Sequence, residues 1–142
     1  MSSTRINPYL NFNGNCREAM TFYRDCLGGK LTLQGIADSP AAAHMPPEAH
    51  QNIMHAVLQR DELIIMGSDM IGDGLKEGNS VALILDCSSK DEIYSLYDKL
   101  SAGGQPTHPL KEEFWGAIFG NLNDKFGNSW LLNFDLNAGQ TS

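Results

Sequence analysis

A histidine inside an apolar strand pattern is the side chain of this sequence best suited to chemistry. His55 lies in the run Ile53–Leu58, whose composition predicts a strand. Because side chains alternate along a strand, His55 is expected to share a face with Ile53 and Val57. If that face lines a cavity, the imidazole is suited to act as a general base or to hydrogen-bond a ligand. A structural hydrogen bond is the alternative, and the sequence leaves both open.

Two polar residues, Ser68 and Asp69, end a second apolar run, Leu63–Met66. An aspartate at a strand end usually caps a turn. If the fold brought Asp69 beside His55, however, the two would form an oriented acid–base pair. We therefore take His55 and Asp69 as candidate catalytic residues, and His55 and Ser68 as candidate ligand-binding residues.

An aromatic pair supplies the remaining candidate ligand contacts. Phe114 and Trp115 follow Glu112 and Glu113, and we predict an exposed turn at Glu112 followed by a strand from Trp115 to Asn121. Neighbouring side chains of a strand point in opposite directions, so one of the two rings is expected to face the cavity. That ring would form an aromatic wall for a small ligand, and the sequence does not decide which ring it is.

The other histidines and the cysteines show no spacing typical of metal ligands. The histidines, expected to be solvated loop residues, are His44, His50 and His108. The cysteines, expected to be reduced and in or near the core, are Cys16, Cys26 and Cys87.

The elements that must position these residues form an internal repeat. Residues 15–29 and 88–104 each predict an amphipathic helix that ends at two glycines. Asn15 with Glu18, and Ser89 with Glu92, have the spacing of a capping box. A repeat of this size restricts the fold more than any single motif.

Strand patterns surround both helices. We predict them at residues 6–12, 30–36, 52–59 and 62–68, and again at 81–85, 105–110, 115–121 and 129–134. Each half is therefore β-α-β-β-β, with module one at about 5–70, a linker at 71–79 and module two at about 80–136. The predicted fold is a single α+β domain over 1–142, with two half-sheets around a cavity and the helices on the outer faces. The long loop 37–51 is expected to act as a lid or to be exchanged between subunits.

The charge pattern argues against two classes of partner. The net charge is −7 and the ten basic residues are scattered, whereas nucleic acids and anionic membranes bind basic faces. No apolar run approaches the ~20 residues of a membrane span, and the first residues do not resemble a secretory leader. We therefore expect a cytoplasmic protein.

The chain resembles the PhnB-like branch of the vicinal-oxygen-chelate superfamily, which includes glyoxalases, extradiol dioxygenases and bleomycin-resistance proteins. The matching segments are 8–19, 22–23, 27–29, 53–56 and 66–69, and above all 114–116, 119–120 and 124–127 with Trp130. The resemblance implies a glyoxalase-like fold and a homodimer. Proteins of this branch are sometimes labelled demethylubiquinone methyltransferases, but this sequence has no glycine-rich loop of the kind that binds nucleotides or adenosylmethionine.

Superfamily members that use a metal usually take His or Glu from four strands, two per module. Carried over, these positions fall on Pro8, near Met66, on Ser80 and on Leu131. None of these side chains holds a divalent cation as histidine or a carboxylate does. We therefore expect no cofactor and no metal at the usual place.

Two functions remain open at this point. The first is a binding protein that holds a small, largely apolar molecule in its cavity without the usual metal. The alternative is an enzyme of the lyase, isomerase or dioxygenase type that uses His55 with a nearby carboxylate, or a metal at unconventional positions. The sequence does not identify the ligand or decide whether there is turnover.

Overall fold

The computed structural model describes residues 4–38, 40–44, 47, 51–70, 74–76, 78 and 80–137. The chain divides into two compact units, Met1–Lys76 and Glu77–Ser142. The division falls inside the predicted linker 71–79. Within the described ranges, no helix is long and apolar enough to cross a membrane.

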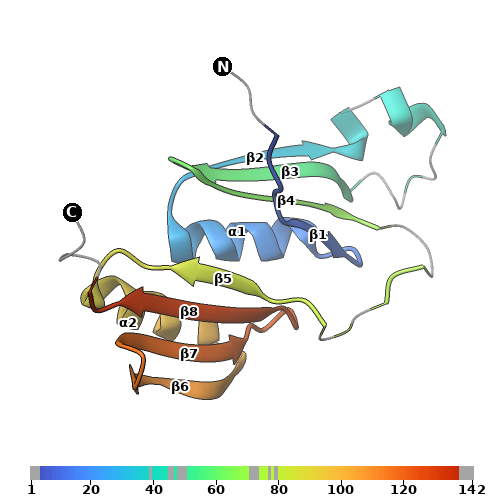
Figure 1. Ribbon diagram of the computed structural model, residues 1–142. Helices are drawn as coiled ribbons and strands as arrows, with labels where there is room; N and C mark the ends of the chain where they lie inside the picture. Colours follow the sequence, from blue (N-terminus) through green and yellow to red (C-terminus); the bar gives the residue numbers. More distant parts are fainter. Residues whose placement is uncertain are drawn as a thin grey trace. The chain divides into compact units, whose positions relative to one another are not determined.

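The first unit is a four-stranded mixed sheet with one helix packed against it (Figure 1). Its elements are β1 (Tyr9–Phe12), α1 (Cys16–Leu27), β2 (Lys30–Gly35), the 3-10 helices η1 (Ile36–Asp38) and η2 (Pro40–His44), β3 (Ile53–Arg60) and β4 (Leu63–Asp69). The strand order is β1-β4-β3-β2. β1 and β4 are parallel, and the other two pairs are antiparallel.

Helix α1 forms where the apolar residues recur at helical spacing, and that stripe is buried against the sheet. The buried side chains are Cys16, Ala19, Met20, Tyr23, Cys26 and Leu27. The helix ends at Gly28 and Gly29, whose φ angles of 79° and 105° lie in the region that favours glycine. A Cβ on Gly29 would lie 2.6 Å from the Gln59 carbonyl oxygen, so the glycine also permits close approach to β3.

The second unit repeats this arrangement. Its elements are β5 (Leu83–Asp86), α2 (Lys90–Ser101), β6 (Gln105–Glu113), β7 (Ala117–Asn123) and β8 (Ser129–Asp135), in the strand order β5-β8-β7-β6. The predicted cap of α2 is confirmed, because the Glu92 amide donates to Ser89 Oγ at 3.0 Å and the Ser88 amide donates to Glu92 Oε1 at 2.8 Å. The predicted α+β fold, with a β-α-β-β-β module on each side of the linker and one helix per sheet, is confirmed.

Several predicted elements differ from the observed ones. β7 begins at Ala117, so Phe114 and Trp115 lie in the turn between β6 and β7 rather than in a strand. His108 lies within β6 and not in a loop, and this strand continues to Glu113, beyond the predicted end at residue 110. The predicted loop 37–51 contains the end of η1 and all of η2, with His44 exposed at the end of η2. His50 lies outside the described residues.

Candidate functional site

The first sheet has one face covered by α1 and an opposite face that we call the open face. Gly67 of β4 identifies the face that α1 covers, because a Cβ on this residue would lie 3.4 Å from the Met20 sulfur of α1. Its neighbours Met66 and Ser68 therefore point to the open face. Cross-strand register extends this face over β3 and β2, where the pairs are His55 with Gln34, Val57 with Thr32, and Gln59 with Lys30.

His55 lies on the open face because β3 contains an irregularity. The register shifts between Gln34, which pairs with His55, and Gly35, which pairs with Ile53. Met54 is the extra residue, so Ile53 turns to the helix side and is fully buried. His55 therefore shares its face with Val57 as expected, but not with Ile53.

An aromatic neighbour orients the His55 ring. Tyr9 of β1 stacks on it, with ring centroids 6.0 Å apart and an interplanar angle of 28°. Tyr9 pairs with Met66 in β4, so it belongs to the same face, and it is 45% exposed. No local pattern of the sequence marks Tyr9, because only the parallel pairing of β1 with β4 brings it within reach of His55 in β3.

Ser68 is the β4 neighbour of His55. The antiparallel ladder ends at the pair of Ala56 with Gly67, and His55 and Ser68 are the next residues of the two strands beyond that pair. Two predicted ligand-binding residues from separate strands thus lie on the same face, at the end of the ladder.

Asp69 points to the other face. Its Oδ1 accepts from the Cys16 amide at 2.9 Å and its Oδ2 accepts from the Ile53 amide at 2.8 Å, both in buried surroundings. The carboxylate thus caps the first turn of α1, while Asn15 makes no side-chain cap hydrogen bond. His55 and Asp69 lie on opposite sides of the sheet and form no acid–base pair, so Asp69 serves in this structure as a structural acceptor.

The same carboxylate affects the thiol of Cys16. Burial, and next the negative charge of Asp69, raise the pKa of Cys16 to about 12, and Arg17 acts weakly in the opposite direction. A thiol with such a pKa is unreactive at neutral pH. Cys16 is thus a core residue, as the sequence indicated.

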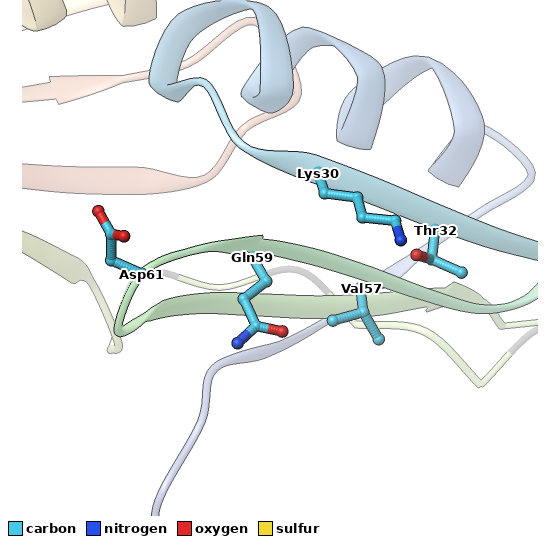
Figure 2. A pocket seen from close by; sticks show the side chains of 5 residues that line it. All are labelled: Lys30, Thr32, Val57, Gln59 and Asp61. Carbon is cyan, nitrogen blue, oxygen red and sulfur yellow. The ribbon is translucent and has the colours of Figure 1, made fainter.

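A pocket of about 390 Å³ continues the open face toward the β3–β4 turn. Figure 2 shows its lining side chains, which are Lys30, Thr32, Val57, Gln59 and Asp61. Val57 follows His55 on the same face of β3, so the pocket and the Tyr9–His55 pair belong to one surface. Most of the lining is polar, and the sequence alone offered no signal for it, because Lys30 and Gln59 meet only through the register.

The aromatic pair of the second unit is held by a turn. The Gly116 amide donates to the Glu113 carbonyl at 3.0 Å, and Gly116 has a φ of 88°. The Trp115 ring contacts Phe114 at 5.0 Å and Phe119 of β7 at 6.1 Å between centroids. Phe114 is 97% exposed and Trp115 is 53% exposed. Both rings are therefore accessible from solvent.

The usual metal positions of the superfamily do not fit a metal here. Met66 and Leu131 point away from the helices, and their partners in β1 and β5 are Tyr9 and Ile84 rather than Pro8 and Ser80. A tyrosine, two aliphatic residues and a methionine do not supply the histidine and carboxylate set of such a centre. In the described part of the chain, no group of three or more His, Cys, Asp or Glu is arranged to hold a metal ion.

Comparison with known proteins gives consistent matches over most of the chain. The family model described as 3-demethylubiquinone-9 3-methyltransferase matches residues 4–133. Protein YjdN of Escherichia coli (strain K12) is 31% identical over 140 residues, covering 90% of this chain and 93% of that protein. The crystal structure of protein PA1353 from Pseudomonas aeruginosa is similar with a TM-score of 0.79 and 38% identity, covering 94% and 98% of the two chains. The PhnB protein from Bacillus cereus has a TM-score of 0.74 at 24% identity, covering 92% and 99%, which shows the fold alone.

Proposed function

Because this chain belongs to the PhnB-like branch of the vicinal-oxygen-chelate superfamily, we propose that it binds a small, largely apolar molecule without the usual metal of that superfamily. The observation that carries this proposal is the open face of the first sheet. There the stacked Tyr9–His55 pair lies beside Met66 and Val57, and a pocket begins at Val57. The Tyr9 ring, Met66 and Val57 supply apolar area there, and His55, Ser68 and the pocket supply polar groups, a combination found at small-molecule sites.

The proposed ligand has an apolar body and a polar end. Its body packs on Met66, Val57 and the Tyr9 ring, while His55 and Ser68 supply hydrogen bonds. The polar end reaches the pocket, where Lys30 and other polar side chains provide donors and acceptors. Phe114 and Trp115, both exposed, are proposed separately as ligand-binding residues of the second unit by itself.

Binding is favoured over acid–base catalysis because the carboxylate first expected to assist His55 is occupied. Asp69 accepts two backbone hydrogen bonds on the helix side. We also propose that the protein is a cytoplasmic homodimer. Exposed apolar side chains such as Val81 (77%) and Ile84 (54%) support self-association, which sedimentation equilibrium would test.

A thermal-shift screen of small aromatic and aliphatic metabolites tests the binding proposal, since a ligand that binds the native state raises the Tm. For a compound that raises the Tm, His55→Ala should weaken binding about tenfold or more in calorimetry. His44→Ala, which removes an exposed histidine from the same unit, should leave binding unchanged. Full affinity in the His55 variant would refute the site, and stoichiometric metal in protein purified without chelators would refute the metal-free proposal.

A further inference from the structure

The turn between β1 and α1 carries a dipeptide that is prone to spontaneous chemistry. Asn13 and Gly14 form the one Asn-Gly pair of the sequence, and both residues are exposed. Gly14 has a φ of 88°, and a Cβ on it would meet nothing within 4 Å. The pair therefore lies at the surface, with open space beside Gly14.

The two groups that would react are both accessible. In the described part of the chain, no hydrogen bond holds the Gly14 amide or the Asn13 side chain. The side-chain amide carbon of an asparagine is an electrophile, and the backbone nitrogen of the next residue is placed to attack it and close a five-membered ring. A side chain on that next residue obstructs the approach, and glycine has none. Asn13 thus has both the neighbour and the access that ring closure requires.

The turn is exposed, but both of its ends are fixed. The Phe12 carbonyl accepts from the Met70 amide at 2.7 Å, and the Cys16 amide donates to Asp69 Oδ1 at 2.9 Å. Phe12 is 4% exposed and Cys16 is fully buried. A change in the length of the main chain within residues 13–15 would therefore act on the end of β1 and on the first turn of α1.

We propose that Asn13 is a site of deamidation and isoaspartate formation in the folded protein. The Gly14 nitrogen bonds to Cγ of Asn13 while the Cγ–Nδ2 bond breaks, so ammonia leaves with the Gly14 amide proton and a succinimide remains. Water then opens the ring, giving aspartate where the bond at Cγ breaks and isoaspartate where the bond at the main-chain carbonyl carbon breaks.

Isoaspartate routes the main chain through its side chain and so adds one carbon between Phe12 and Cys16. This lengthening shifts the Cys16 amide relative to Asp69, and it therefore weakens the cap of α1. The inference goes beyond the proposed function, because it concerns a covalent change of the chain itself and involves no ligand.

Peptide mass analysis of the native protein, incubated for days at mildly alkaline pH, tests the site. The peptide that contains Asn13 should gain the mass difference between an amide and a carboxylic acid, and electron-transfer fragmentation should place isoaspartate at residue 13. Asn128 is the internal control and should keep its amide, because Ser129 follows it and the Asn128 backbone amide donates to Asp124 Oδ1 at 3.0 Å. An unchanged Asn13, or equal conversion at Asn128, would overturn the proposal.

A matched variant tests the ring closure. Asn13→Gln keeps the side-chain amide and Gly14, but its longer side chain would have to close a six-membered ring. It should lose ammonia about tenfold more slowly, which corresponds to about 1.4 kcal/mol in the barrier. Equal rates of loss from Asn13 and from the glutamine variant would overturn the succinimide route.

The isoaspartyl fraction of the aged protein, separated by chromatography, tests the effect on α1. Asn13→Asp controls for the new charge, since it carries the same carboxylate on a main chain of normal length. The isoaspartyl fraction should unfold a few degrees below Asn13→Asp in a thermal melt. Equal Tm values would overturn the inferred weakening of the cap.

Discussion

Removing the Asp69 carboxylate should destabilise the protein. In Asp69→Ala the buried amides of Cys16 and Ile53 both lose their acceptor. Each buried N–H left without a partner costs about 1–3 kcal/mol, so the expected loss is about 2–6 kcal/mol. This is a large fraction of the 5–15 kcal/mol that typically stabilises a domain. Asp69→Asn retains one acceptor oxygen and should lose about half as much.

Urea unfolding followed by circular dichroism measures this loss as a change in midpoint. Asp25→Ala is the matched control, because this carboxylate is 65% exposed and, among the residues that the structure describes, pairs with adjacent Arg24 on the surface. Its expected effect is within about 0.5 kcal/mol. A second readout is the Cys16 thiol, whose pKa should fall in Asp69→Asn because a neighbouring negative charge is removed. A loss below about 1 kcal/mol in Asp69→Ala would refute the capping role.

Two further predictions concern the core thiols and the helix caps. Burial raises the pKa of Cys16 to about 12, whereas Cys87 is partly exposed. Iodoacetamide at pH 8 should therefore label Cys87 in the native protein and Cys16 only after unfolding, as peptide mass analysis would show. Rapid labelling of Cys16 in the native protein would contradict its burial. Ser89→Ala should lower the free energy of unfolding in urea by about 1 kcal/mol, because Ser89 caps α2. Asn15→Ala, at the start of α1, should lower it much less, because the Asn15 side chain makes no cap hydrogen bond. Equal losses would show that the two helices are capped alike.

Local patterns predicted most of the fold. Both helices lie where the apolar spacing placed them. α2 ends at Ser101, with Ala102 in an extended conformation before the glycine pair. α1 ends at its glycine pair as predicted, because a left-handed residue stops a helix within its own sequence. The Ser89–Glu92 cap was predicted correctly for the same reason, since its partners lie within one turn. The corresponding prediction for α1 was wrong, because its acceptor, Asp69, comes from β4.

The candidate site was less predictable. The alternation rule placed His55 with Val57 but misplaced Ile53, because a one-residue irregularity changes the face of every residue beyond it. The turn closed by Gly116 removed Trp115 from the predicted strand. The pairing of His108 with Glu113 likewise depends on a bulge that leaves no periodic signal.

The sequence by itself determined the duplicated order of elements and the two helix faces. These properties depend on residue type and on spacing within a single segment. Only the tertiary structure decided that Tyr9 stacks on His55, that Asp69 serves α1 rather than His55, and that Glu113 meets His108. These contacts join residues from different strands or across a bulge, and their geometry is set by sheet register, which no local pattern encodes.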